Sequence, residues 1–210
     1  MALFPLFVDI EGKKCVVVGG GSVAERRICV LLDFGARITV VSPEISPSIK
    51  ELKWKDKLVI IKKRYSSEDI EDAFLAIAAT NQPDINEQVA IDGARMGIPV
   101  NIADNREKCS FMFPAVVRRG EIVVGISTSG GFPALSGRIR RKIEDTFPQY
   151  YGDMLEVLKE ARDRAENISD TAARKELLKN IMDEVLFYEN AVTMDQLKKR
   201  INKIFEENEL

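Results

Sequence analysis

The chain has 210 residues, of which 45% are hydrophobic, so it can bury a substantial core as one domain with an appendage or as two small domains. Its 31 basic and 33 acidic residues leave a formal charge of -2, which argues against a nucleic-acid partner, because bulk binding needs a basic excess. No apolar stretch approaches the ~20 residues that span a bilayer, and no basic segment precedes a long apolar run at the N-terminus, so we expect a cytoplasmic protein with no membrane partner.

The first predicted elements are a strand, a glycine-rich turn and a helix. Cys15 to Val18 is too short and too β-branched for a helix and is typical of a strand buried on both faces of a parallel sheet. Gly19, Gly21 and Ala24 fit the pattern G-x-G-x-x-G/A, in which the glycines allow a tight turn and close approach of a pyrophosphate. The helix that follows offers its unpaired N–H groups to phosphate.

A second strand completes the unit. Ile28, Leu31 and Leu32 recur at helical spacing, Gly35 suits the end of that helix, and Ile38 to Val41 is the next strand. The unit has the ~30 residues that a βαβ unit needs. This context favours dinucleotide binding; a turn without a nucleotide and a methyl-donor site remain as alternatives.

The segment after the second strand bears on the choice of cofactor. Dinucleotide sites place an acidic residue there to bind the ribose, and here the acid is displaced by two positions in Ser42-Pro43-Glu44. Ser42 or Glu44 can still reach the ribose, and no arginine stands in this stretch to favour a 2′-phosphate. NAD is therefore preferred over NADP.

Strands and helices continue to alternate as far as Ala103. Further strands are predicted at Leu58 to Ile61, Phe74 to Ala79 and Pro99 to Ala103, with a short helix at Ile70 to Ala73 and a longer one at Asp84 to Met96. This alternation predicts an α/β fold with a Rossmann-type, doubly wound parallel sheet.

The carboxyl ends of these strands define one rim, where such sheets bind ligands. The Gly19 turn, Ser42, Thr80-Asn81 and Asn101 to Asp104 all fall on it. Asp104 is the best-placed acid/base candidate, because the chain has no histidine and proton transfer must use another group. The alternative is an aspartate that caps the following turn.

A polar loop and a basic helix follow the strand Glu121 to Ser127. The hydroxyls and backbone donors of Ser127 to Gly131 can hold a carboxylate or phosphate, and Pro133 suits the first turn of the next helix. That helix carries three basic side chains on one face: Arg138, Arg141 and Lys142. Loop and helix suggest a polyanionic small-molecule substrate; a solvated basic face paired with nearby acids is the alternative.

The C-terminal stretch is helical and charged. Helices are predicted at Asp153 to Asn167, from a cap at Ser169-Asp170 through Ile181, and from Thr193 onward. Apolar residues at helical spacing in the first of them are expected in a core: Met154, Leu155, Leu158 and Ala161.

The three cysteines do not predict a metal site. Cys15, Cys29 and Cys109 lie in or beside apolar sequence and form no C-x-x-C pair. We expect reduced core residues and no resident metal.

Several motifs together resemble a known family. They are Phe4-Pro5-Leu6-Phe7, Val18 to Arg26, Ala78-Ala79-Thr80-Asn81 with Asn86, Asn101-Ile102-Ala103-Asp104, Phe111 to Ala115 and Ser127 to Leu135. In these motifs the chain resembles the precorrin-2 dehydrogenase family, the N-terminal region of siroheme synthase. It departs from many relatives at Ser127-Thr128-Ser129 and at Phe132.

The resemblance implies NAD-dependent oxidation of precorrin-2 to sirohydrochlorin in siroheme biosynthesis, and in some members the insertion of ferrous iron into the product. It implies an NAD-binding Rossmann domain at 1–113, a central dimerisation and substrate-loop region at 114–148, and a helical domain at 149–210, assembled as a homodimer. A non-enzymatic NAD-sensing module is the alternative, but it would need neither the acid on the rim nor the loop with its arginine helix.

The residues and the resemblance together give a predicted site, with Asp104 as the catalytic residue. The predicted cofactor-binding residues are Gly19, Gly21, Ser22, Val23, Ala24, Ser42, Pro43, Glu44, Thr80 and Asn81. The predicted substrate-binding residues are Asn101, Ser127, Thr128, Ser129, Gly130 and Arg138.

Overall fold

The computed structural model describes residues 3–52, 55–188 and 191–207. The chain divides into two compact units. Unit 1 is Met1–Pro114 with Ser127–Phe132, and unit 2 is Ala115–Ile126 with Pro133–Leu210. The three regions expected from the sequence, 1–113, 114–148 and 149–210, stay a prediction beside this division.

Unit 1 is built on a parallel sheet of five strands. They are β1 (Lys14–Val18), β2 (Arg37–Val41), β3 (Leu58–Ile61), β4 (Leu75–Ala78) and β5 (Val100–Ile102). Their order in the sheet is β3-β2-β1-β4-β5, and every neighbouring pair is parallel. The predicted Rossmann-type fold is confirmed, because the order reverses between β1 and β4 as in doubly wound sheets.

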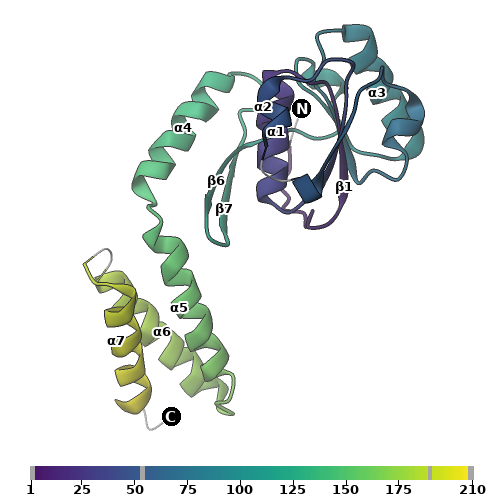
Figure 1. Cartoon of the computed structure of the whole chain (residues 1–210). Helices are drawn as coiled ribbons and strands as arrows, with labels where there is room; N and C mark the ends of the chain where they lie inside the picture. The colour runs from purple at the N-terminus through teal and green to yellow at the C-terminus, as the bar shows by residue number, and fades with distance from the viewer. Residues whose placement is uncertain (1–2, 53–54, 189–190, 208–210) are drawn as a thin grey trace. The chain divides into compact units, whose positions relative to one another are not determined.

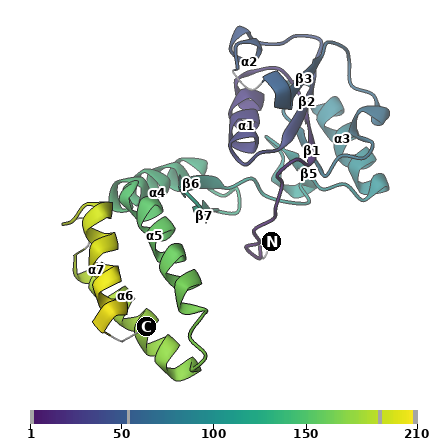
Figure 2. The same cartoon turned by 60° about the horizontal axis from the view of Figure 1, so that its bottom comes forward.

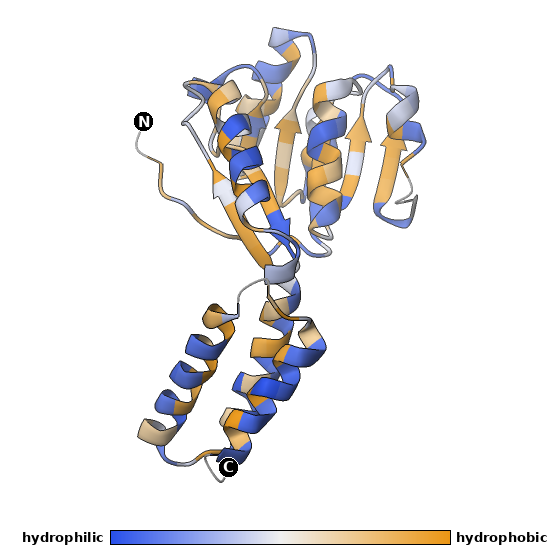
Figure 3. Cartoon of the chain, turned by 90° about the vertical axis from the view of Figure 1, so that its left-hand side faces the viewer, coloured by the Kyte–Doolittle hydropathy of each residue, from blue (hydrophilic) through white to orange (hydrophobic). Residues whose placement is uncertain are grey.

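Helices cover both faces of the sheet (Figure 1). On one face α1 (Ser22–Asp33) and α2 (Pro47–Lys50) pack on alternate residues of the strands, and on the other lies α3 (Pro83–Met96). The strands are mostly orange, that is hydrophobic, in Figure 3, and the strands β1, β4 and β5 are buried on both faces, whereas β3 exposes Val59 and Ile61. Gly35, with φ +81°, follows α1 as the sequence predicts.

The helix expected at Ile70 to Ala73 is wrong. The segment instead forms a short 3-10 helix, η2 (Ser67–Ile70), which begins at a reciprocal cap between Ser66 and Asp69. Asp72 has φ +58°, so the chain leaves helical conformation before Ala73. Two further 3-10 turns are η1 (Lys55–Lys57) and η3 (Arg106–Lys108).

Unit 2 combines a hairpin with helices. Its elements are β6 (Ala115–Arg119), β7 (Ile122–Ile126), α4 (Pro133–Thr146), α5 (Tyr150–Ala165), α6 (Thr171–Phe187) and α7 (Met194–Glu207). Strands β6 and β7 pair antiparallel. The sequence predicted β7 and the helices but not β6, whose five residues, two of them arginine, lack the apolar run that marks the other strands.

The helices α5, α6 and α7 share a core of their own. Leu177, Ile181 and Leu197 are fully buried in it, and Met154 and Ala161 join them as predicted. Asp170 begins α6, and its carboxylate accepts the N–H of Ala172 at 2.8 Å. Over the described residues, no helix combines the length and apolar character needed to cross a membrane.

A buried polar cluster joins the end of β3 to α3 in unit 1. The Tyr65 hydroxyl donates to Asp92 Oδ2 at 3.0 Å, and Arg95 Nη2 lies 3.3 Å from Asp92 Oδ1. Burial, reinforced by the hydrogen bond to the Asp92 carboxylate, raises the pKa of Tyr65. The neutral phenol is therefore the form that stabilises the fold.

The raised pKa of Tyr65 predicts a loss of stability at alkaline pH. A folded-state pKa above the unfolded value of about 10 gives a contribution that is complete below about pH 10 and decreases as pH rises further. We expect Tyr65→Phe to lower the free energy of unfolding by about 1–2 kcal/mol near neutral pH, because Asp92 loses a donor. Above about pH 10 the stability of the variant should decline less steeply than that of the unmodified protein. Urea unfolding of the unmodified protein and of Tyr65→Phe across this pH range checks the prediction. Stabilities that declined in parallel would contradict a raised pKa of Tyr65.

Candidate dinucleotide and substrate site

The candidate site lies at the carboxyl ends of β1 and β4, where the strand order of the sheet reverses. Gly19 has φ +128°, and a Cβ there would lie 2.3 Å from the Ala79 carbonyl oxygen. A Cβ on Gly20 would lie 2.0 Å from the Glu44 carbonyl oxygen. These two glycines therefore let the loops after β1, β2 and β4 meet.

Gly21 serves a different purpose. A Cβ at this position would meet no atom within 4 Å, so the space before α1 is open. Gly21 is the N-cap of α1 and no side chain caps that first turn, while Ala24 is fully buried against the sheet. Exposed backbone donors at the N-terminus of a helix fit the pyrophosphate of a dinucleotide.

The predicted roles of Gly19, Gly21 and Ala24 agree with these surroundings, but sequence reasoning gave no role to Gly20. Its signal was the middle position of three consecutive glycines. Ser22 and Val23 lie exposed at the start of α1, next to the open space. Their contact with a cofactor stays a prediction.

The loop after β2 is folded by its own hydrogen bonds. Ser42 is nearly buried, and its hydroxyl donates to the Glu44 carbonyl oxygen at 2.7 Å. The N–H of Ser46 donates to the Gly20 carbonyl oxygen at 2.9 Å, which ties this loop to the glycine turn. Pro43 and Glu44 are exposed beside that turn, where a ribose would lie.

The loop after β4 is held by a single buried side chain. Asn86, in the first turn of α3, is only 2% exposed. Its Oδ1 accepts the Thr80 N–H at 3.1 Å and the Thr80 hydroxyl at 2.7 Å, and its Nδ2 donates to the Thr80 carbonyl oxygen at 3.1 Å. Thr80 is thereby fixed, and the next residue, Asn81, is exposed.

Asp104 lies on the same rim, two residues beyond β5. The preceding residue, Ala103, donates its N–H to the Ala78 carbonyl oxygen at 2.9 Å, which places Asp104 beside the end of β4. Its Oδ1 is 3.5 Å from Asn86 Nδ2. The following turn is capped by Asn105, whose Oδ1 accepts the N–H of Glu107 at 3.2 Å, so the alternative capping role does not fall to Asp104.

Asn101 lies within the sheet and is 3% exposed. Its Nδ2 donates to the Phe111 carbonyl oxygen at 3.0 Å and is 3.5 Å from Cys109 Sγ, while its Oδ1 has no hydrogen-bond partner. Cys109 Sγ in turn accepts the Ile102 N–H at 3.1 Å. Both side chains hold the segment after Asp104, and a substrate contact of Asn101 stays a prediction.

Of the three cysteines expected in the core, Cys15 is buried, whereas Cys29 and Cys109 are only partly buried. Cys15, Cys29 and Cys109 are all free thiols. Burial raises the pKa of Cys15 to about 11, so this thiol stays protonated. In the described part of the chain, no group of three or more His, Cys, Asp or Glu side chains gathers as metal ligands do.

The loop Ser127 to Gly130 lies against the segment that carries Asp104. Arg106 Nη1 donates to the Ser129 carbonyl oxygen at 3.3 Å. Ser129 and Gly130 have φ +52° and +73°, and a Cβ on Gly130 would lie 3.2 Å from the Arg106 side chain. The structure thus brings this predicted substrate loop and the predicted acid into one part of unit 1.

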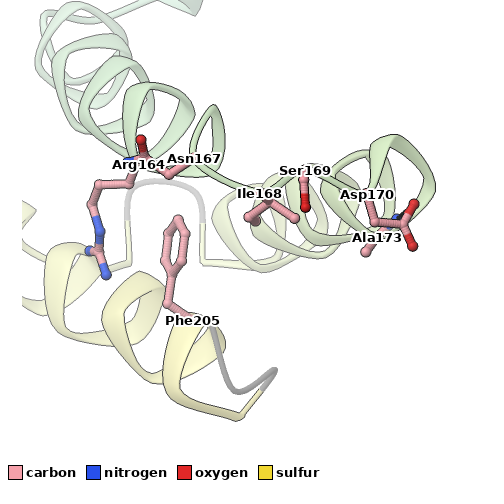
Figure 4. A pocket seen from close by; sticks show the side chains of 7 residues that line it. All are labelled: Arg164, Asn167, Ile168, Ser169, Asp170, Ala173 and Phe205. Carbon is pink, nitrogen blue, oxygen red and sulfur yellow. Dashed lines mark hydrogen bonds between the residues drawn. The ribbon is translucent and has the colours of Figure 1, made fainter.

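Arg138 belongs to α4 in unit 2, and its role stays a prediction. Unit 2 also holds a depression of about 590 Å³ at the turn between α5 and α6 (Figure 4). Its lining residues are Arg164, Asn167, Ile168, Ser169, Asp170, Ala173 and Phe205. The Arg164 guanidinium lies 4.0 Å from the centre of the Phe205 ring, and none of the predicted site residues lines this depression.

The sheet, its reversal point and the glycine turn define a Rossmann-type nucleotide-binding protein. A family model described as putative NAD(P)-binding matches residues 6–115. The siroheme synthase of Ectopseudomonas mendocina is 36% identical over 190 residues, which cover 90% of this chain and 39% of that protein. The siroheme synthase of Psychrobacter cryohalolentis is 40% identical over 162 residues, 77% of this chain and 31% of its own length.

A solved structure corresponds over nearly the full length of the chain. The precorrin-2 dehydrogenase SirC is 30% identical, with a TM-score of 0.76, over 96% of this chain and 100% of that one. The chain belongs to the family of precorrin-2 dehydrogenases and siroheme synthases. It spans less than half of the length of the siroheme synthases that it matches here. The predicted resemblance and the predicted NAD cofactor are confirmed, while the choice of NAD over NADP stays a prediction.

Proposed function

We propose that the chain is an NAD-dependent dehydrogenase that oxidises precorrin-2 to sirohydrochlorin in siroheme biosynthesis. One observation carries the proposal: the Asp104 carboxylate lies beside the Asn86-bound Thr80 loop, on the rim that also bears the open glycine turn. The relationship to the precorrin-2 dehydrogenase SirC over the whole of that chain supports the choice of substrate.

The residues present fit the cofactor. The N-terminus of α1, open in front of Gly21, would hold the pyrophosphate, and Ser42 with Glu44 would bind the ribose. Thr80 and Asn81 would line the path toward the nicotinamide. When bound, NAD supplies the hydride acceptor, and the protein supplies orientation and proton transfer.

Asp104 would take the proton that the macrocycle releases when a hydride leaves, so that the substrate loses two hydrogens in all. Precorrin-2 is a polycarboxylate, and the loop Ser127 to Gly130 offers hydroxyl and backbone donors next to Arg106. These groups of the loop would hold the reacting carbon within reach of both the cofactor and Asp104. The predicted contact of Arg138, in unit 2, with a substrate carboxylate stays a prediction.

The function is tested by mixing anaerobic, enzymatically made precorrin-2 with NAD and the protein, and following NADH and sirohydrochlorin. We expect both products to appear only with protein and NAD present. A parallel arm with ferrous iron shows whether siroheme forms faster than in the control without protein. Folded protein that binds NAD but leaves precorrin-2 unchanged would favour the sensor alternative, and binding of a methyl donor in place of NAD would favour a methyltransferase.

We infer that two copies of the chain assemble as a homodimer. The 14-residue helix α4 has no buried residue, and its apolar side chains Leu135 and Ile139 are exposed. The segment that begins at Leu3 (Figure 2) exposes 86% of Phe4, 74% of Leu6 and 71% of Phe7. Apolar surfaces of this kind are typical of protein interfaces.

Light scattering tests the dimer. We expect twice the chain mass for the unmodified protein, and the mass of one chain for a variant with both Leu135→Asp and Ile139→Asp, since burial of two carboxylates opposes association. The matched control places charge on the exposed Met182 of α6, as Met182→Asp, and should keep the dimer. A single-chain mass for the unmodified protein would contradict the inference.

A further inference from the structure

Asn86 connects two loops of the candidate site that belong to different strands. It reaches Thr80, after β4, with three hydrogen bonds, and Asp104, after β5, with a fourth contact. We propose that Asn86 is a positioning residue: it fixes the Asp104 carboxylate relative to the loop after β4, which lies beside the cofactor in the proposed function. Asp104 is then held where it can take the proton while the cofactor takes the hydride. This rests on the proposed function.

The orientation of the Asn86 amide follows from its contacts with Thr80. The Thr80 N–H must meet an acceptor and the Thr80 carbonyl oxygen must meet a donor, and they lie 3.1 Å from Oδ1 and 3.1 Å from Nδ2 respectively. A flipped amide would place donor against donor and acceptor against acceptor. Nδ2 therefore has its second N–H available toward Asp104 Oδ1.

Burial makes this arrangement stiff. Asn86 is 2% exposed, so any polar atom of its side chain that lost its partner would be left without water. The three bonds to Thr80 fix the amide, and the amide then presents a donor at a set position on the rim. The distance from Asn86 Nδ2 to Asp104 Oδ1 is 3.5 Å, at the outer limit of a hydrogen bond.

The chemistry of the contact requires an amide at this position. An aspartate would keep the size of the side chain and could still accept from Thr80 through one oxygen. It would replace the donor that faces Asp104 with an oxygen and set two carboxylates against each other. Asn86→Asp therefore removes the link to Asp104 with little change of shape. It also removes the donor to the Thr80 carbonyl oxygen, and the Asp104→Ala background measures that loss by itself.

The experiment is a double-mutant cycle on kcat with precorrin-2 and NAD. Asn86→Asp should lower kcat by about 10- to 100-fold in the unmodified protein, because small displacements of a reacting group have effects of this size. In an Asp104→Ala background the same change should lower kcat by less than about twofold, because the group it positions is absent. The matched control is Gln88→Glu, the same amide-to-acid change at an exposed site of α3, which should leave kcat unchanged.

Two results would overturn the proposal: an equal loss of kcat from Asn86→Asp in both backgrounds, which marks a purely structural effect, or no loss at all. The proposed function fails on a different observation, the absence of turnover in unmodified protein. The link is then tested by the reactivity of the Asp104 carboxyl toward a carbodiimide, measured at Asp104 itself by peptide mass spectrometry, so that the new carboxyl at position 86 does not contribute. Asn86→Asp must change that reactivity in folded protein, and an unchanged rate overturns the link.

Discussion

Asp104→Ala is expected to lower kcat for precorrin-2 oxidation by about 10²- to 10⁴-fold, the range that removal of a general base produces. The carboxylate is exposed on the rim beside the end of β4, and the chain has no histidine to replace it. The affinity for NAD should change little, because the glycine turn and the loop after β2 are untouched. Steady-state kinetics and calorimetric titration with NAD separate the two effects.

The matched control for Asp104→Ala is Glu107→Ala, which removes an exposed carboxylate from the same segment. It should keep the full rate. Asp104→Asn should be as slow as Asp104→Ala, because it keeps the shape of the side chain and loses the base. A rate within about threefold of the unmodified protein in either Asp104 variant would remove this residue from the mechanism.

Substitution of two glycines in one turn should give opposite results. Gly19→Ala should destabilise unit 1 by about 3 kcal/mol or more, because its Cβ would lie 2.3 Å from the Ala79 carbonyl oxygen at a φ of +128°. Gly21→Ala should change stability by less than about 1 kcal/mol, since its Cβ meets no protein atom. It should instead weaken NAD binding at least about tenfold, by occupying the space meant for the pyrophosphate.

The Gly21 variant tests the site and the Gly19 variant tests the fold. Urea unfolding measures stability, and calorimetry measures NAD affinity in protein shown to be folded. Gly97→Ala, at another left-handed glycine with no atom within 4 Å of its Cβ, is the control for backbone strain without a clash. If Gly21→Ala bound NAD as the unmodified protein does, the dinucleotide would not cross this turn.

Local patterns were sufficient to predict the parallel sheet. Most of its strands are short apolar runs, and glycine or polar residues follow each strand within two positions; each strand lies within the range expected for it or differs from that range by one residue. The pattern has this power because strands of a doubly wound sheet are buried on both faces. The carboxyl-end rim follows from the parallel order alone, so the grouping of Gly19, Ser42, Thr80 and Asp104 could also be predicted.

The features of the fold and the site that could not be predicted from sequence depend on contacts between distant residues. A side chain on Gly20 would clash with the Glu44 carbonyl oxygen, and Asn86 contacts both Thr80 and Asp104; the three glycines and the motif that includes Asn86 mark these positions but not their partners. The strand β6 forms only because β7 pairs with it. The 3-10 turn η2 replaced the expected helix because a side-chain cap and one left-handed residue outweighed the apolar spacing.

The most direct test of the account is the stoichiometry of a single anaerobic turnover with protein in excess over precorrin-2. Oxidation by hydride transfer predicts one NADH formed for each sirohydrochlorin, with both appearing at the same rate. Both rates should fall together in the Asp104→Ala protein. Sirohydrochlorin that appeared without NADH would contradict the proposed mechanism. So would an Asp104→Ala protein that formed both products as fast as the unmodified protein does.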